Sequence, residues 1–421
     1  MISAQKVPLF DLVMCLSSTM DLIDPALVNH HKRVAYIASN IGSQMGLSID
    51  QQNDLLIAGA LHDIGALSLT DKLAALQFDF KNPQEHAEIG YQLLHNFEPF
   101  AKIAVLVRYH HVDWNEGTGT DFKGGRVPIG SSILHLADRV AILIKDGQEI
   151  LSQVKSIRDQ VEEQSNKMFM PQIVKTFVEL SDKEYFWFDA VSQNIGETLR
   201  KRAGLGATQL DMKSLLDLSS LFRRIIDFRS RFTATHSSGV AATAEALARL
   251  MGFSERECLM IKVAGYLHDL GKLAVPAEIL EKPAQLAEDE MFVMKRHTFL
   301  SYRTLECISE LNIINDWGSL HHERLDGSGY PFHIKGSDIP MGSRIMAVAD
   351  VFTALSEDRP YRKAMNHDRV LLILQEMSAN QALDSDVVTM LKLHFDDINS
   401  IRMAAQATSI EEYRRFLQAQ N

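Results

Sequence analysis

The chain has 421 residues, 46% of them hydrophobic, which is enough for two domains with separate cores. Its formal net charge of −11 argues against long-range attraction of nucleic acid, so we expect no DNA partner. No apolar run reaches the roughly 18 residues that a membrane span requires, and the N-terminus lacks the pattern of an export signal. These features predict a cytoplasmic protein with no membrane partner, and they say nothing about its oligomeric state.

The first half of the chain carries histidine and aspartate side chains in a pattern that suits metal binding. They are His30, His62, Asp63, His86, His110, His111 and Asp138. Ser48 followed by Gln51 is the signature of a helix N-terminus, and the apolar spacing after it predicts a helix that leads to His62. Side chains of this kind on several helices of one domain can converge on a buried site.

The second half repeats this pattern with His236, His268, Asp269, His297, His321, His322 and Asp350. The first His and the His-Asp pair are 32 residues apart in both halves (30 to 62, 236 to 268). The third His and the His-His pair are 24 residues apart in both (86 to 110, 297 to 321). A repeat of this length is a duplicated domain rather than a solenoid unit. With the boundary in the glycine-bearing stretch 201–206, we expect domains at 1–205 and 206–421.

Helical periodicity dominates the second half as well. Apolar spacing predicts a helix over residues 236–251, which Gly252 ends. Ser254 with Glu257 predicts the start of the next helix, which we expect to end near Gly271. No segment shows the period-two alternation and turns of a hairpin. The predicted fold is all-α, with two tandem helical bundle domains whose ligands point inward from several helices.

The ligand types narrow the chemistry of the second-half site. Imidazole nitrogens with a few carboxylate oxygens suit Fe, Mn, Zn, Ni or Co better than Mg or Ca. Five histidines and two aspartates exceed the needs of one ion and suit two, with Asp269 placed beside His268 to bridge them. Bridged ions about 3.5–4 Å apart are the arrangement of two-metal phosphoesterases, and they supply hydroxide near neutral pH. These residues therefore predict a metal-dependent phosphodiester hydrolase.

Longer motifs in the second half resemble a known family. They are His-Asp-Leu-Gly-Lys at 268–272, the run at 321–331 that ends in Gly-Tyr-Pro, Ala-Asp-Val-Phe at 349–352 and Arg-Pro-Tyr-Arg-Lys at 359–363. From about residue 236 to residue 365 the chain resembles the HD-GYP cyclic-dinucleotide phosphodiesterases. The resemblance implies hydrolysis of cyclic di-GMP or 3′,3′-cyclic GMP-AMP at a centre of two or three metal ions, with Fe or Mn favoured. The implied product is a linear 5′-phosphorylated dinucleotide, which a second cut would convert to mononucleotides.

The resemblance also implies roles for individual residues. The seven second-half residues match the family's metal ligands, with Asp269 at the catalytic centre. Lys272 matches a lysine beside the scissile phosphate, where it holds the phosphate or protonates the leaving oxygen. Arg359 and Arg362 match positions that grip substrate phosphates, although Arg362 also fits a plain solvated turn. Members with three metals carry a Glu four residues before the first His; this chain has Phe232 there, so we expect two ions.

The first copy departs from the family pattern outside its seven metal-type residues. Ala66 stands in place of Lys272, and Thr120 with Asp121 replaces the Tyr-Pro of the Gly-Tyr-Pro motif. Gly147 and Ile150 occupy the places of the two arginines. We therefore expect a degenerate domain that can hold metal, lacks the groups for a dinucleotide, and contacts the second domain to stabilise or regulate it. The alternative is that its histidines persist only as packing.

Two other functions stay open at this point. One is a phosphohydrolase of mononucleotides with the same metal chemistry, and the other is a non-catalytic protein that senses a cyclic dinucleotide or binds a protein partner. The motifs do not specify the base preference of the substrate pocket. Within the run at 321–331, Glu323 or Asp326 is placed to orient a ligand histidine.

Overall fold

The computed structural model describes residues 6–22, 28–66, 84–202, 209–228, 233–358 and 362–418. Contacts divide the chain into an N-terminal domain, Pro8–Gln209, and a C-terminal domain that begins at Leu210. The boundary expected between residues 205 and 206 falls within 203–208, which lie outside the described residues. Of the helices that the structure describes, none is long and apolar enough to cross a membrane.

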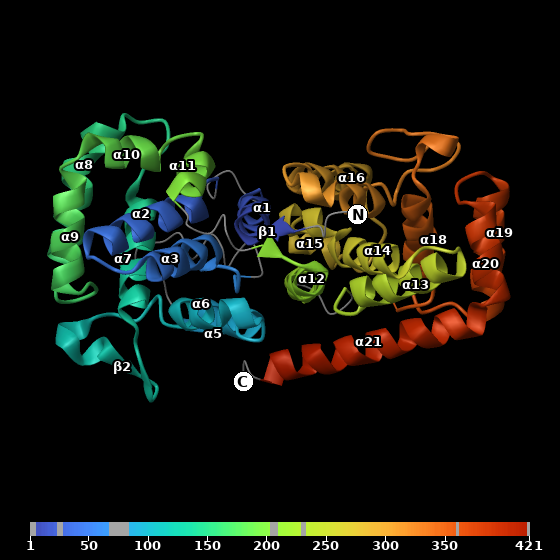
Figure 1. Ribbon diagram of the computed structural model, residues 1–421, viewed down its shortest axis with the longest axis horizontal. Coiled ribbons are helices and arrows are strands. Elements are labelled where there is room, and N and C mark those ends of the chain that lie inside the picture. The colour runs from blue at the N-terminus through green and yellow to red at the C-terminus, as the bar shows by residue number, and fades with distance from the viewer. Residues whose placement is uncertain are drawn as a thin grey trace. The chain divides into compact units, whose positions relative to one another are not determined.

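The N-terminal domain is built of helices around α2. Its helices are α1 (Leu9–Asp21), α2 (His30–Gln44), α3 (Ile49–Leu61), α5 (Gln84–Leu94), α6 (Ala101–Arg108), α7 (Ile129–Leu143), α8 (Ile150–Glu163), α9 (Pro171–Ser181), α10 (Glu184–Ala190) and α11 (Ile195–Arg202), with 3-10 turns η2 (Glu98–Phe100) and η3 (Asn115–Thr120). Helix α2 packs against α3 and α7, and α9 and α11 also contact it (Figure 1). The core therefore forms along α2, the helix that carries the first histidine.

The C-terminal domain repeats this plan around α13. Its helices are α12 (Met212–Asp227), α13 (His236–Leu250), α14 (Glu255–Leu267), α15 (Ala277–Leu280), α16 (Glu288–Glu306), α17 (Asn312–Ser319), α18 (Met341–Leu355), α19 (His367–Ala379), α20 (Ser385–Leu393) and α21 (Phe395–Gln418), with 3-10 turns η5 (Leu270–Ala274), η6 (Ser309–Leu311) and η7 (Gly336–Asp338). Helix α13 packs against α14, α18 and α21. The long helix α21 runs beneath α13 and α14 in Figure 1.

Strands contribute little to either domain, and the all-α prediction is confirmed. The strands are β1 (Val7–Pro8), β2 (Asp121–Phe122), β3 (Gly125–Arg126) and β4 (Gln209–Leu210), each of two residues. They pair as β1 with β4 and as an antiparallel β2–β3 hairpin. Apolar residues at helical spacing bury one face of each amphipathic helix, which favours helix packing over sheet formation.

Two of the predicted helix starts are capping boxes, as expected. The Ser254 hydroxyl accepts from the Glu257 amide at 3.3 Å, and the Glu257 carboxylate accepts from the Ser254 amide at 2.8 Å. Ser48 and Gln51 make the same pair of bonds at 3.3 and 3.1 Å. These bonds satisfy backbone donors that have no partner within the helix. Gly252 follows α13 with a φ of 84°, the conformation that ends a helix.

The helix opened by Ser254 ends earlier than expected. We expected it to continue to near Gly271, but α14 stops at Leu267 and the turn η5 begins at Leu270. At the expected end the backbone instead touches α16, since a Cβ on Gly271 would lie 2.0 Å from the carbonyl oxygen of His297. Gly65 makes the same approach, 2.0 Å, to the carbonyl oxygen of His86. In both domains this glycine therefore lets the His-Asp turn touch the backbone of the third histidine.

A second glycine in each domain sets how closely the two ligand-bearing helices approach. A Cβ on Gly265 of α14 would lie 2.5 Å from the Cα of Ala241 on α13. A Cβ on Gly59 of α3 would lie 2.6 Å from the Cα of Ala35 on α2. Only glycine permits such contact between backbones. The contact brings the first histidine of each domain toward the His-Asp pair at the end of the next helix.

We expect Gly265→Ala to destabilise the protein by about 1–3 kcal/mol, because the added methyl group overpacks the contact with Ala241. Gly196→Ala on α11 is the matched control, since a Cβ there meets no atom within 4 Å. We expect the control to change stability by less than about 1 kcal/mol. Urea unfolding of both variants checks this expectation. Equal unfolding midpoints would contradict the role assigned to Gly265.

Candidate metal centres

The seven metal-type residues of the C-terminal domain come together in its interior. His236 begins α13, His268 and Asp269 follow α14, His297 lies in α16, His321 and His322 follow α17, and Asp350 lies in α18. Three overlapping groups have ligand atoms within 4.8 Å of one another: His236, His268 and Asp350; His268, Asp269 and His321; and His297, His321 and His322. All seven side chains are buried or nearly so. Residues 114 positions apart in the chain thus meet at one point.

The carboxylate of Asp269 lies between two sets of imidazoles. Its Oδ2 is 3.1 Å from Nε2 of His268, and its Oδ1 is 3.3 Å from Nε2 of His297. On the His268 side, Nε2 of His236 lies 3.0 Å from Oδ1 of Asp350. Each oxygen of one carboxylate therefore faces a different group of ligands. This geometry suits a carboxylate shared by two ions.

Local hydrogen bonds aim three of the histidines. Nδ1 of His268 lies 2.8 Å from the carbonyl oxygen of Gly265, Nδ1 of His297 lies 2.7 Å from that of Met294, and Nδ1 of His321 lies 2.6 Å from that of Gly318. A carbonyl only accepts, so Nδ1 carries the proton in each case. The lone pair then sits on Nε2, which points into the cluster.

The polar atoms at the centre of this cluster lack partners that would justify their burial. Nε2 of His268, Nε2 of His297 and Oδ1 of Asp269 are buried and make no hydrogen bond with the described residues. Burial lowers the pKa of His297 to about 3 and that of His322 to about 4, so both imidazoles are neutral near pH 7. Neutral imidazoles and a carboxylate oxygen that point together with no donor between them fit a transition-metal centre.

Lys272 lies beside the shared carboxylate. Its Nζ is 2.5 Å from Oδ2 of Asp269, and its side chain is mostly buried in the turn η5. Burial alone would raise the pKa of Asp269, but its interactions with His268 and with the ammonium of Lys272 hold it well below the usual value. The structure thus brings an ammonium group to the edge of the candidate metal centre.

Of the two arginines expected to grip substrate phosphates, Arg362 is bonded to the backbone. The guanidinium of Arg362 donates to the carbonyl oxygens of Ala354 at 2.6 Å, Lys363 at 3.0 Å and Leu355 at 3.2 Å. These bonds tie it to the C-terminal end of α18 and to Lys363, and they favour a role in holding the turn. Arg359 and Phe232 lie outside the described residues.

The loop at 321–331 is held by Glu323, which is buried. Its carboxylate accepts from the amide of Phe332 at 2.7 Å and from that of Ile334 at 3.1 Å. Asp326 accepts from the amide of Ser328 at 2.8 Å. The contacts therefore do not support the expectation that one of these carboxylates orients a ligand histidine. Both carboxylates bond backbone amides and hold the loop. The residue that sequence reasoning missed is Tyr330, whose ring centroid lies 4.8 Å from that of His322.

The N-terminal domain assembles its own seven residues in the same way. One group is Asp63, His86, His110 and His111, and a second is His30, His62 and Asp63, each with ligand atoms within 4.8 Å of one another. Oδ1 of Asp63 lies 3.2 Å from Nε2 of His86, and Oδ2 lies 3.2 Å from Nε2 of His62. Asp138 completes the second group, with Oδ1 3.3 Å from Nε2 of His30. Asp63 therefore occupies the same shared position as Asp269.

The N-terminal cluster likewise contains buried polar atoms that make no hydrogen bond with the described residues. Nδ1 of His62 lies 2.9 Å from the carbonyl oxygen of Gly59, and Nδ1 of His110 lies 2.6 Å from that of Val107. Buried atoms without a hydrogen bond among the described residues include Nε2 of His30, His62 and His110 and one oxygen each of Asp63 and Asp138. The residues fit two ions as well as those of the C-terminal domain do.

Two residues beside the N-terminal candidate ligands, Arg139 and His31, are replaced in the C-terminal domain by Val351 and Ser237. The guanidinium of Arg139 is buried and donates to Oδ2 of Asp138 at 2.6 Å. The residue after Asp350 is Val351. Similarly, His31 contacts Asp21, whereas Ser237 donates to Asp227 at 2.7 Å. A position-by-position alignment of the two copies would have found Arg139, because it follows a predicted ligand directly.

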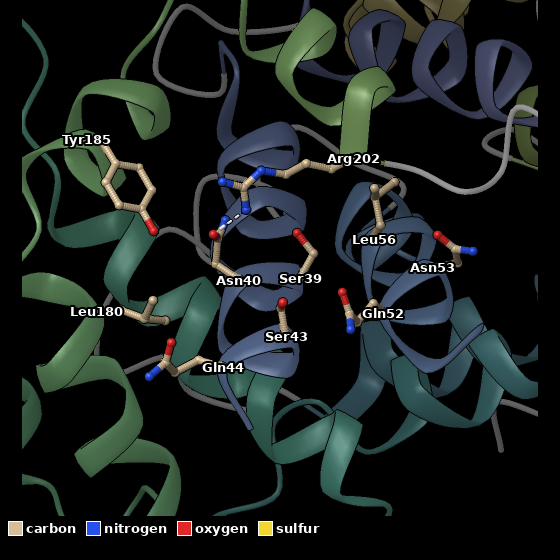
Figure 2. A pocket seen from close by; sticks show the side chains of 10 residues that line it. All are labelled: Ser39, Asn40, Ser43, Gln44, Gln52, Asn53, Leu56, Leu180, Tyr185 and Arg202. Carbon is tan, nitrogen blue, oxygen red and sulfur yellow. Dashed lines mark hydrogen bonds between the residues drawn. The ribbon is translucent and has the colours of Figure 1, made fainter. Parts of the chain in front are cut away.

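The N-terminal domain also has cavities near and away from its cluster. One of 660 Å³ is lined by His111 together with Asp113, Glu116 and Lys167 among others. A second, of 370 Å³, lies away from the cluster, where the guanidinium of Arg202 bonds Asn40 (Figure 2). Amide and hydroxyl side chains line most of this second cavity, with no imidazole or carboxylate among the lining residues. It offers neither metal ligands nor an acid–base pair.

Comparison with known proteins identifies both clusters as parts of one domain type. A family described as HD domain matches residues 27–143, and a second family of the same description matches residues 220–387. The chain is 31% identical to 3′3′-cGAMP-specific phosphodiesterase 1 of Vibrio cholerae over 94% of its own length and 93% of that relative's. It is 27% identical to 3′3′-cGAMP-specific phosphodiesterase 3 of the same organism, over 93% of this chain and 95% of that relative.

Further comparisons agree on the fold and on the C-terminal domain. A crystal structure of the cyclic GMP-AMP specific phosphodiesterase V-cGAP3 of V. cholerae has a TM-score of 0.65 at 23% identity, covering 93% of this chain and 98% of that chain, so the fold is shared. The cyclic di-GMP phosphodiesterase response regulator RpfG of Xanthomonas campestris is 40% identical over 42% of this chain and 47% of that protein. The resemblance drawn from the motifs is therefore confirmed: this chain, with its two HD domains, belongs to the HD-GYP family of cyclic-dinucleotide phosphodiesterases.

Proposed function

We propose that the C-terminal domain hydrolyses 3′,3′-cyclic GMP-AMP, with cyclic di-GMP as the poorer substrate. The observation that carries the proposal is the shared carboxylate of Asp269, set between two groups of buried imidazoles with Lys272 beside it. The extent of the matches supports this base preference. The two relatives that align with this chain over nearly their whole length are both named as 3′3′-cGAMP-specific phosphodiesterases. The cyclic di-GMP phosphodiesterase RpfG aligns over less than half of this chain.

The seven residues of the C-terminal cluster would hold two divalent transition ions, Fe or Mn in preference to Zn, Ni or Co. Such a pair supplies Lewis-acid activation of the phosphate and of a water molecule near neutral pH. The carbonyl contacts at Nδ1 keep the imidazoles aimed, so little reorganisation is needed when substrate binds. Exclusion of bulk water by the buried cluster strengthens these charge interactions.

The proposed reaction opens the dinucleotide ring at one phosphate. Oxygen from water forms a new bond to phosphorus, and the bond from phosphorus to the ribose 3′ oxygen breaks. The 3′ oxygen leaves with a proton, for which the ammonium of Lys272 is a suitable donor. The product is a linear dinucleotide with a 5′-phosphate, and a second round at its remaining diester gives mononucleotides.

We assign the N-terminal domain a structural or regulatory metal site. Its ligand geometry matches that of the C-terminal domain, but the place of Lys272 is taken by Ala66, which is buried. The buried cation nearest in sequence to its ligands is Arg139, whose guanidinium is bound to Asp138. A dinucleotide diphosphate would therefore lack the lysine that stands beside the shared carboxylate in the C-terminal domain, and a bound ion would serve mainly to join the helices.

The substrate proposal predicts a higher kcat/KM for 3′,3′-cyclic GMP-AMP than for cyclic di-GMP when the purified protein is supplied with Mn²⁺ or Fe²⁺. Product chromatography should give the linear 5′-phosphorylated dinucleotide first. A panel with nucleoside monophosphates and triphosphates tests the wider HD chemistry. Turnover of mononucleotides alone, or dinucleotide binding without turnover, would replace the proposal with one of those functions.

Replacing His268 and Asp269 together by Ala should remove two ions per chain and abolish turnover, because both faces of the shared site lose a ligand. Metal analysis and the dinucleotide assay are run on the same preparation. Persistent turnover would place the chemistry elsewhere.

The matched variant replaces His62 and Asp63 by Ala in the N-terminal domain. We expect it to lose metal as well, but to change activity only through the stability or regulation of the protein. Unchanged metal content would mean that this cluster holds no ion. If metal is lost while melting temperature and activity both stay as in the wild type, the proposed structural or regulatory role is wrong.

Lys272→Met should lower kcat by about 10²–10⁴-fold, the usual contribution of a proton donor, while the bound metal stays near the wild-type amount. Lys272→Arg, which keeps the positive charge, should retain more activity than the Met variant. Steady-state kinetics with metal analysis distinguishes the two effects. Loss of metal in parallel with activity would instead make Lys272 a structural partner of Asp269.

A further inference from the structure

The first histidine of the C-terminal cluster has a buried carboxylate behind it. Nδ1 of His236 lies 2.8 Å from Oε1 of Glu357, a residue that follows α18. Oε2 of Glu357 accepts from the side-chain amide of Gln406 on α21 at 2.8 Å. The amide oxygen of Gln406 accepts from the guanidinium of Arg402, one turn earlier on α21, at 2.5 Å. These four side chains are buried and form one chain of hydrogen bonds.

The donor and acceptor of each of these hydrogen bonds can be assigned by starting from Arg402. A guanidinium only donates, so the oxygen of the Gln406 amide must face Arg402. The NH₂ group of Gln406 then faces Glu357 and donates to it. As an ionised carboxylate, with Oε2 accepting from Gln406, Glu357 also accepts on Oε1, and the proton between Glu357 and His236 then belongs to Nδ1 of the histidine. His236 is left with its Nε2 lone pair toward the cluster.

This assignment has a consequence on the other side of the ring. Nε2 of His236 lies 3.0 Å from Oδ1 of Asp350. With the proton held at Nδ1, a lone pair of nitrogen faces a lone pair of a carboxylate. Two acceptors at that distance repel each other unless a cation lies against both. The chain from α21 thus prepares His236 and Asp350 for the same ion.

The packing of α13 is shaped to admit this chain. A Cβ on Gly239 would lie 2.9 Å from Nε2 of Gln406, so the glycine leaves the space in which the amide reaches Glu357. Arg402 is fixed in turn by Asn399, whose side-chain oxygen accepts from it at 2.7 Å. The N-terminal domain has no such device at the equivalent positions: Arg33 stands for Gly239 and pairs with Asp146, and Lys145 stands for Glu357.

We propose that Glu357, Gln406 and Arg402 are positioning residues that fix the tautomer and orientation of His236. Helix α21 thereby becomes part of the C-terminal metal centre, although its residues lie beyond 220–387, the part matched to the HD domain family. The proposal rests on the C-terminal cluster holding metal. It does not depend on which nucleotide is cleaved.

The test measures metal affinity without substrate. Full-length wild-type protein, Glu357→Gln and Gln406→Met are stripped with a chelator and titrated with Mn²⁺ against a metal-binding dye. Loss of the carboxylate behind a ligand histidine should weaken Mn²⁺ binding to the C-terminal centre by about 10–100-fold. Gln406→Met removes one hydrogen bond farther from the ion and should weaken it by about 2–10-fold. The N-terminal domain contributes the same background in every protein.

Glu411→Gln is the matched control, because it removes an exposed carboxylate of α21 whose ion pair is with Arg415 on the same helix. It should bind Mn²⁺ as the wild type does. In kinetic assays, saturating Mn²⁺ should restore most of the kcat of Glu357→Gln with KM for the dinucleotide unchanged. A Mn²⁺ titration of Glu357→Gln that superimposes on the wild type overturns the proposal, whatever its melting temperature.

If Glu357→Gln does not fold, Gln406→Met decides alone, and wild-type affinity in that variant overturns the proposal. Failure of the substrate proposal is distinguishable from this outcome. A protein that cleaves no cyclic dinucleotide still gives a Mn²⁺ titration, and the difference between variants is still read from it.

Discussion

Each domain depends on one aspartate whose two carboxylate oxygens face different sets of imidazoles. In the C-terminal domain Asp269 stands between His268 and His297, and in the N-terminal domain Asp63 stands between His62 and His86. Buried acceptors that point at one another are costly unless a cation satisfies them. The surrounding helices must therefore hold the ligands against that repulsion, and much of the local fold can be understood as the means of doing so.

The means are backbone contacts that recur in both copies. Gly265 and Gly59 let two ligand-bearing helices touch, and Gly271 and Gly65 let the His-Asp turn reach the helix of the third histidine. Carbonyls three residues earlier fix the histidine tautomers. None of these contacts requires a substrate-binding residue. This explains how the N-terminal copy retained a complete ligand geometry after it lost the lysine and the Gly-Tyr-Pro motif.

The two copies differ in how their clusters are supported from behind. In the C-terminal cluster the first histidine, His236, is bonded to the carboxylate of Glu357. That carboxylate accepts from the amide of Gln406, which in turn accepts from the guanidinium of Arg402. The N-terminal one places the charge of Arg139 directly on the ligand Asp138. In the C-terminal copy the cation held on a carboxylate is the ammonium of Lys272 on Asp269, and Ala66 takes its place in the N-terminal copy. The buried cation therefore lies on a different carboxylate in each copy.

The sequence by itself determined the duplication, the helical class, the capping boxes at Ser48 and Ser254 and the two sets of candidate ligands. These features are carried by local periodicity and by spacing, which survive without knowledge of packing. It placed the end of the helix that begins after Ser254 near Gly271, whereas that helix ends at Leu267.

Only the tertiary structure decided which oxygen of each aspartate faces which imidazole and that Arg362 is bound to backbone carbonyls. The tertiary structure also brings His236 to Glu357, 121 residues away in the sequence, and Glu357 to Gln406, 49 residues away. No local pattern encodes such bonds, because they depend on where separate helices cross and on which side chain fills the space between them.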